Sequence, residues 1–224
     1  MKNFTFYEQV GILIPGAVFL AAMTALAPAV IPWLSAGGTS VGDLGIFLVV
    51  AYAAGHAVAA LGNLLEKVFW RCFGGMPTEW LVKSSQSLLT TAQVDNLRTL
   101  VKERCGIDAP ALPGASRRQW APIYGQIYRD VLSNNPGRIE TFNGNYGLNR
   151  GLAAALGCIA IALAFMQPPH VGTLITVSLV LMVIYLYRMY RFGVHFAREV
   201  YFSFLIPART KRPVTNCSTG VAAE

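Results

Sequence analysis

The chain has 224 residues, of which 54% are hydrophobic and only 13% are charged. Soluble domains carry about 25% charged residues, so this composition excludes an ordinary soluble domain and indicates a membrane protein. The chain is also basic, because 18 Lys and Arg residues outnumber 11 Asp and Glu residues and leave a net charge of +7.

Four apolar stretches account for the shortage of charge. They cover Val10–Trp33, Leu44–Leu65, Leu148–Met166 and Val171–Tyr187. Each approaches the ~20 residues that a helix needs to cross a hydrocarbon core of about 30 Å. None carries the charged face that a surface helix of a soluble protein shows with a period of 3.6 residues. The sequence therefore predicts an all-α fold with four transmembrane helices.

The positions of the basic residues predict how these helices are oriented. The segment 35–45 and the hairpin 167–172 contain no Lys or Arg, whereas basic residues are frequent from Lys67 to Arg150 and from Arg188 to Arg212. Positively charged loops stay in the cytoplasm. We therefore expect a multi-pass protein of the cell inner membrane with both termini and the central region on the cytoplasmic side.

The chain divides into four predicted regions. They are an N-terminal transmembrane hairpin (1–65), a cytoplasmic helical region between helices 2 and 3 (66–144), a C-terminal transmembrane hairpin with a cytoplasmic helix extension (145–206) and a disordered tail (207–224). Thr90 with Gln93, and Ser116 with Gln119, form capping-box patterns. We therefore expect two helices in the central region. Gly74-Gly75-Met76-Pro77 is expected to end the second transmembrane helix.

The second apolar stretch carries a polar stripe. Tyr52, His56, Ala59, Asn63 and Glu66 recur at spacings that place them on one helix face. Polar groups within a bilayer usually face a bundle interior or a water-filled path. Tyr52, His56, Asn63 and Glu66 are therefore candidates for a pore lining, with a proton-responsive position at His56. The alternative is that His56 and Asn63 bond to neighbouring helices as part of the packing.

Small residues accompany this stripe on two of the predicted membrane helices. They are Gly55, Ala59 and Gly62 on the second helix and Gly147, Gly151, Ala154 and Ala155 on the third. Such spacing allows helix backbones to approach closely. The pattern fits packing within one subunit and an interface between subunits equally well.

Basic and aromatic residues suggest sites for an anionic ligand. Arg117 and Arg118 lie beside Trp120 and not far from Arg138 in the sequence, an arrangement that suits a nucleotide because rings stack on bases and cations meet phosphates. Arg191, His195 and Arg198 share one face of the last helix. The alternative for both groups is a solvated, positive-inside surface that anchors the protein to anionic lipids.

Signatures of enzymes and metal sites are missing from the sequence. There is no G-x-S-x-G, no H-E-x-x-H and no closely spaced pair of carboxylates, and the three histidines fall at three different predicted depths. The four cysteines are scattered without a C-x-x-C pair. We therefore expect no enzymatic activity, no bound metal and no cofactor.

Several short strings carry a resemblance to a known class of protein. They are Phe6-Tyr7-Glu8 followed by Ile14-Pro15-Gly16, Gly55-His56, Gly74-Gly75-Met76-Pro77, and Asn145-Tyr146-Gly147 followed by Arg150-Gly151. Together with the architecture, they resemble small multi-pass bacterial membrane proteins that act as effectors in anti-phage defence. The resemblance implies homo-oligomers that disturb the membrane when a cytoplasmic signal, often a nucleotide, binds or leaves.

Two functions follow as hypotheses. The first is an oligomeric membrane channel or membrane-disrupting effector that a cytoplasmic signal gates, with a nucleotide as the anionic ligand. The second is a non-conducting anchor that recruits a soluble cytoplasmic partner protein. Membrane lipids are partners in both cases.

Overall fold

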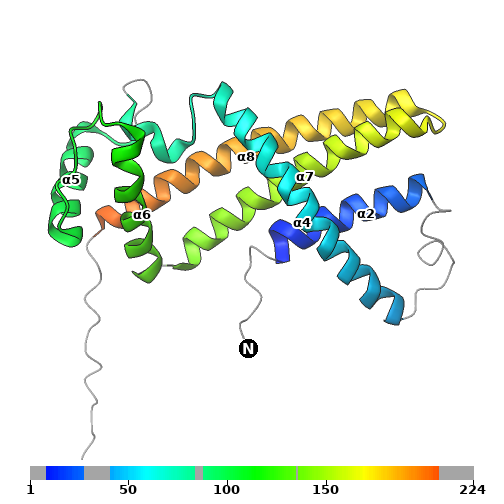
Figure 1. The fold of residues 1–224 in the computed structure, drawn as a ribbon, viewed down its shortest axis with the longest axis horizontal. Helices are drawn as coiled ribbons and strands as arrows, with labels where there is room; N and C mark the ends of the chain where they lie inside the picture. Colours follow the sequence, from blue (N-terminus) through cyan, green and yellow to red (C-terminus); the bar gives the residue numbers. More distant parts are fainter. Residues whose placement is uncertain (1–8, 28–40, 84–87, 135, 207–224) are drawn as a thin grey trace, which may run out of the picture.

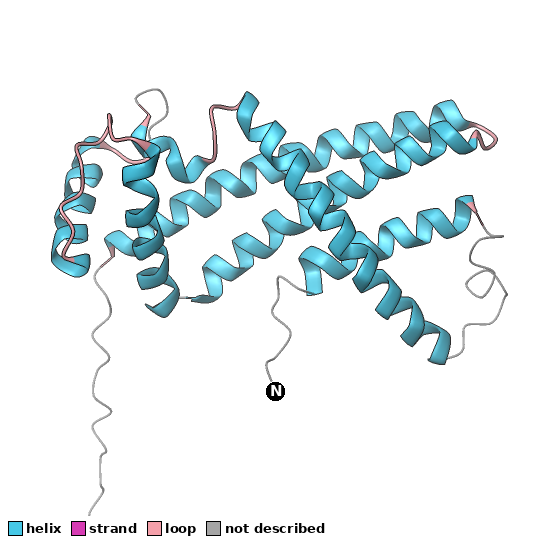
Figure 2. Cartoon of the chain, viewed as in Figure 1, coloured by secondary structure: helices cyan, strands magenta, loops and turns pink. Residues whose placement is uncertain are grey.

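The computed structural model describes residues 9–27, 41–83, 88–134 and 136–206. In chain order the elements are η1 (Gln9–Leu13, a π-helix), α2 (Ile14–Leu26), α4 (Val41–Cys72), η2 (Pro77–Val82, a 3₁₀-helix), α5 (Thr91–Cys105), α6 (Arg117–Asn134), α7 (Pro136–Met166) and α8 (Val171–Leu205). These parts of the chain contain no strand (Figure 2). The predicted all-α fold is confirmed. The predicted tail, 207–224, lies outside the described residues.

Three of the described helices, α4, α7 and α8, are long and apolar enough to cross a membrane. They correspond to the second, third and fourth predicted spans. A shorter apolar helix, Val10–Leu26, corresponds to the first. Its predicted end at Trp33 lies outside the described residues, and the described helix ends at Leu26.

The longest elements, α7 and α8, form an antiparallel hairpin whose helices pack along each other (Figure 1). The turn falls at Pro168 and Pro169, which cannot continue a helix because proline lacks a backbone donor. Both helices run without a break well past their apolar segments, as predicted. The predicted region boundaries at residues 66 and 145 therefore lie inside the continuous helices α4 and α7.

Small residues bring α2, α4 and α7 into backbone contact. A Cβ added to Gly16 would lie 2.0 Å from the carbonyl oxygen of Ala51, and one added to Gly55 would lie 2.3 Å from that of Ile12. A Cβ on Gly151 would lie 2.6 Å from Cγ of Pro15. Packing within one chain therefore accounts for Gly55 and Gly151, one of the two alternatives that the sequence left open.

A compact helical cap, residues 77–83 and 88–134, packs around the C-terminal end of α8, opposite the α7–α8 turn (Figure 1). Both capping boxes are present: Thr90 and Gln93 bond reciprocally, and so do Ser116 and Gln119. The apolar face of α6 is buried against α8. Side chains in this core are fully buried, including Leu97, Trp120, Ile127, Tyr201 and Phe204. The cap and the end of α8 thus share one hydrophobic core.

Candidate functional site

A layer of polar side chains links α4, α7 and α8 at one level of the molecule. Glu66 on α4 forms an ion pair with Arg150 on α7, and the two side chains are only 16% and 12% exposed. On the same part of α7, Asn149 accepts a hydrogen bond of 3.2 Å from Nε of Arg188 on α8. We call these four residues the polar layer. It is costly to bury such charges unless they are paired, so the layer fixes the register of the three helices.

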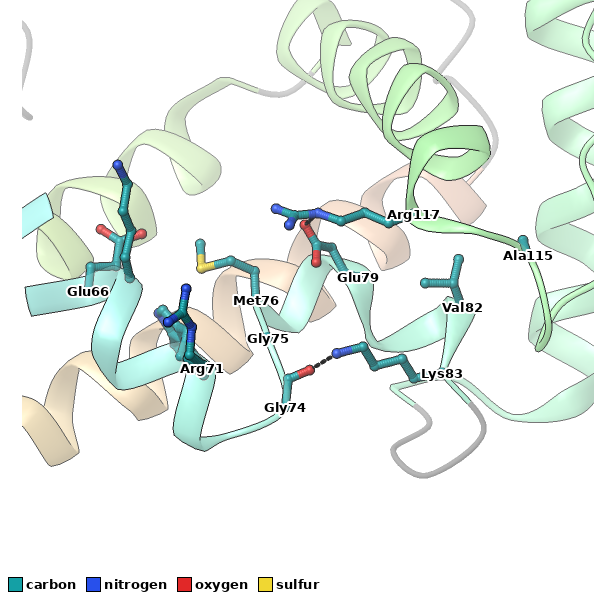
Figure 3. A pocket seen from close by; sticks show the side chains of 12 residues that line it. Glu66, Arg71, Gly74, Gly75, Met76, Glu79, Val82, Lys83, Ala115 and Arg117 are labelled. Atoms are coloured by element: carbon teal, nitrogen blue, oxygen red, sulfur yellow. Dashed lines mark hydrogen bonds and ion pairs between the residues drawn. The ribbon is translucent and has the colours of Figure 1, made fainter. Parts of the chain in front are cut away.

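Next to this layer lies an open cavity of about 570 Å³, between the end of α4, η2 and the start of α6. Its charged lining residues are Glu66, Lys67, Arg71, Glu79, Lys83 and Arg117. We call this cavity the basic groove (Figure 3). Glu66 belongs to both features, so the groove and the polar layer adjoin each other.

Two glycines shape the groove. Gly74 and Gly75 have φ angles of +79° and +98°, a region that side chains other than glycine rarely adopt. They turn the chain sharply after α4, and the amide of Gly75 donates a hydrogen bond of 2.7 Å to the carbonyl of Trp70. Because of this turn, η2 folds back beside the end of α4. The predicted end of the helix at Gly74-Gly75-Met76-Pro77 is confirmed.

The groove holds more positive charge than its carboxylates balance. Arg117 pairs with Glu79 at 2.7 Å, and the two side chains point toward each other in Figure 3. The ammonium group of Lys83 donates to the carbonyl oxygen of Gly74. Both lining carboxylates are already paired, since Glu66 binds Arg150. Lys67 and Arg71 form no ion pair with any residue that the structure describes.

The predicted polar stripe divides between two sides of α4. Its last member, Glu66, turns inward to Arg150, whereas His56 and Asn63 are exposed on the outer side. The Tyr52 ring contacts the His56 ring, with centroids 4.7 Å apart. The buried face of α4 is offset from the stripe by one residue and consists of Ala51, Gly55, Val58 and Gly62. A single chain therefore leaves the middle of the stripe uncovered.

The predicted anion-binding residues also separate. Arg117 lines the groove, but Arg118 is exposed beside it and is not part of the lining. The prediction that Trp120 helps to bind an anion is wrong. Its side chain is only 1% exposed, and its indole nitrogen donates a hydrogen bond to the hydroxyl of Tyr201. It stabilises the cap core and presents no face on which a base could stack, because the apolar side of α6 turns toward α8.

The remaining predicted residues lie along α7 and α8. Arg138 pairs with Glu199 at 3.3 Å. Arg191, His195 and Arg198 are exposed on α8, and the His195 ring stacks against Phe142. None of these residues lines the basic groove. The seven predicted residues are therefore spread over the groove and its surroundings, the cap core, the start of α7 and the exposed side of α8.

Sequence reasoning missed three residues of the groove. Lys67 and Arg71 are four positions apart, a spacing that places them on one face of α4 and that would have identified them as a pair. No spacing in the sequence links Lys83 to this pair, because Lys83 reaches the end of α4 only through the turn at Gly74 and Gly75.

Metal-binding and reactive groups are sparse in the described parts of the chain. No group of three or more His, Cys, Asp or Glu side chains there could hold a metal ion. Cys72, Cys105 and Cys158 are free thiols, and Cys217 lies outside the described residues. Burial and the carboxylate of Asp130 raise the pKa of Cys105, so its thiol is poorly suited to act as a nucleophile.

No family model, curated protein or solved structure matches this chain. The function proposed for it therefore rests on the polar layer, the basic groove and the continuous helices that join them.

Proposed function

We propose that this protein is a homo-oligomeric channel or membrane-disrupting effector of the inner membrane, whose state an anionic cytoplasmic signal sets at the helical cap. One observation carries the proposal: α7 and α8 run from their apolar segments into the cap region without a break. The cap core includes side chains of α8 itself, such as Tyr201 and Phe204. A change in the cap would therefore move the membrane segments with it.

The position of the polar layer supports this placement in the membrane. Arg150 lies about 16 residues before the end of α7, and Arg188 about 17 residues after the start of α8. At ~1.5 Å per residue these distances are roughly 24–26 Å, close to the ~30 Å of a hydrocarbon core. The layer would thus lie near the cytoplasmic surface, with the basic groove and the cap in the cytoplasm, as the distribution of basic residues also favours.

The proposal includes four spans. The apolar helix Val10–Leu26 packs against α4 and α7 rather than on the cap, so it belongs with the membrane segments. An even number of spans returns the chain to the side from which it started. Both termini are then cytoplasmic, together with the cap.

The outer side of α4 supports the homo-oligomer. His56 and Asn63 are exposed there, within a helix of high hydropathy. Polar side chains at membrane depth are costly against lipid and usually face protein or water. A second copy packed on this side would cover both residues and place them along a path between subunits.

Ion flux tests the proposal. The purified full-length chain would be reconstituted into liposomes loaded with a self-quenching dye and KCl, and efflux would be measured with and without added ATP. We expect efflux that Asn63→Leu reduces and that Leu64→Val, a neighbouring apolar position that is also exposed, leaves unchanged. If neither ions nor dye leave the liposomes under any condition, the proposal is wrong. Co-purification of a stoichiometric soluble partner would then favour the membrane anchor.

A further inference from the structure

We infer that the basic groove is a binding site for a phosphate-bearing anion, held by Lys67, Arg71 and Lys83 with Arg117 at its edge. The anion is either the headgroup of an anionic lipid or the phosphate chain of a soluble nucleotide. This inference rests on the proposed function for the consequence of binding, since it names where the anionic signal acts.

The first support is the charge of the groove. Its lining contains four cations and two carboxylates, and each carboxylate already has an arginine partner. Lys67 and Arg71 stand on the last two turns of α4 and form no ion pair among the described residues. Neighbouring cations repel each other, so a bound dianion would stabilise the pair as well as the groove.

The second support is the shape of the groove. Its volume of about 570 Å³ lies within the ~300–1,000 Å³ typical of small-molecule sites. One wall is the backbone of Gly74 and Gly75, where a Cβ on Gly75 would lie 3.0 Å from Nζ of Lys83. The glycines leave room for the Lys83 ammonium group to lie against this wall, near the end of α4.

Arg117 lies at the edge of the groove, where its side chain can contact a bound anion. Its side chain is 75% exposed, although it pairs with the more buried Glu79. The pair with Glu79 uses Nε of Arg117, so the other two guanidinium nitrogens can donate to a phosphate while Glu79 stays paired. Because Arg117 begins α6, such a contact would connect the bound anion to the cap.

The position of the groove explains how binding would reach the membrane segments. Lys67 directly follows Glu66, which pairs with Arg150 on α7. A dianion beside Lys67 would change the electrostatic field at this ion pair. The groove also adjoins the polar layer, where lipid phosphates lie if the layer marks the membrane surface. Lipid headgroups and soluble nucleotides can therefore both reach it.

Binding would be measured on the full-length protein in a neutral detergent by native mass spectrometry. One arm uses short-chain phosphatidylglycerol, a second uses ATP, and short-chain phosphatidylcholine serves as the reference for uncharged binding. The test variant is Lys67→Glu with Arg71→Glu. The control is Lys102→Glu with Arg129→Glu, which makes the same change in net charge at two exposed sites outside the groove.

We expect at least one anion to bind the wild type, with affinity falling about tenfold or more in the test variant and less than about twofold in the control. Binding of the lipid alone identifies a headgroup, and binding of ATP alone identifies a nucleotide. Equal affinities in the wild type and the test variant, or no binding of either anion to the wild type, would overturn the inference.

If the charge-reversed variant fails to give a monodisperse protein, Lys67→Gln with Arg71→Gln takes its place with the same expectation. The measurement does not depend on conduction. Binding without flux would therefore contradict the proposed function and leave the site intact, whereas flux without binding would contradict the site alone.

Discussion

At the scale of single residues, the Glu66–Arg150 ion pair joins two of the long apolar helices. Its partners come from α4 and α7 and are largely buried. Removing one partner of a buried pair leaves an uncompensated charge, whereas replacing both with apolar residues is often tolerated. The pair therefore fixes which faces of the two helices meet more than it adds net stability.

We predict that Glu66→Gln lowers the stability of the solubilised protein by about 3–5 kcal/mol, because Arg150 loses its carboxylate. Thermal unfolding in detergent would measure the change. Asp108→Asn is the matched control: Asp108 pairs with Lys102 at 2.9 Å, but both side chains are mostly exposed, so the loss should be below about 1 kcal/mol. The double variant Glu66→Leu with Arg150→Met should recover most of the loss. Equal losses in Glu66→Gln and Asp108→Asn would contradict this account.

At the scale of elements, the contact between α2 and α4 depends on the absence of side chains. Gly16 and Gly55 face each other, and a Cβ on Gly16 would lie 2.5 Å from the backbone nitrogen of Gly55. Backbone atoms cannot move aside as the end of a flexible side chain can. Any larger residue at either position must push the two helices apart.

We predict that Gly16→Ala destabilises the protein by about 1–3 kcal/mol through overpacking. Gly45→Ala is the control, because a Cβ at Gly45 meets nothing within 4 Å and alanine favours a helix. This control should be neutral or stabilising by up to about 1 kcal/mol. Thermal unfolding in one detergent compares the two. A Gly16→Ala protein as stable as the wild type would show that α2 does not pack as closely as described.

At the scale of the whole molecule, the long helices connect apolar segments at one end to the helical cap at the other. The apolar segments of α4 and α8 are mostly exposed, while the cap and the end of α8 share one buried core. Two properties of this arrangement can be tested in intact membranes: the orientation of the chain and the contact between copies.

We predict that Cys72, the exposed last residue of α4, reacts only from the cytoplasmic side. In a Cys217→Ser background, a membrane-impermeant maleimide should label Cys72 in inside-out vesicles and leave it unmodified in right-side-out vesicles. Cys158 lies within the apolar segment of α7 and should remain unlabelled in both. Labelling of Cys72 from the outside would reverse the proposed orientation.

We also predict that Asn63→Cys, in a background without native cysteines, forms a disulfide between copies when membranes are treated with a mild oxidant. The reason is that, in the proposed homo-oligomer, a second copy covers the outer side of α4. Val177→Cys on α8, which is 51% exposed, controls for random collisions. A non-reducing gel reads the result. Crosslinking that is no more efficient at position 63 than at position 177 would contradict an interface at α4.

The elements of this fold could largely be predicted from the sequence, because they depend on local pattern. The apolar run Val171–Tyr187, its polar continuation to Leu205 and the capping box at Thr90 each lie within one stretch of chain. Helix formation and insertion into lipid respond to such stretches directly. The distribution of Lys and Arg likewise predicts an orientation without any knowledge of packing.

The candidate site could be predicted only in part, because it depends on which helix faces meet. Glu66, Asn63 and His56 share one stripe, yet only Glu66 turns inward and pairs with another helix, at Arg150 on α7, whereas His56 and Asn63 lie exposed on the outer side of α4. Trp120 has the sequence context of a ligand-binding residue and is a core residue instead.

The apolar stretches, the helices and the basic character of the central region can be read from the sequence, because each depends on residues that are neighbours in the chain. That Lys67, Lys83 and Arg117 line one groove follows only from the packed structure. These residues come from three separate segments, and the left-handed turn at Gly74 and Gly75 brings them together. Charge can be counted along a chain, but a binding site requires charges to converge in space, and that convergence is a property of the packed helices.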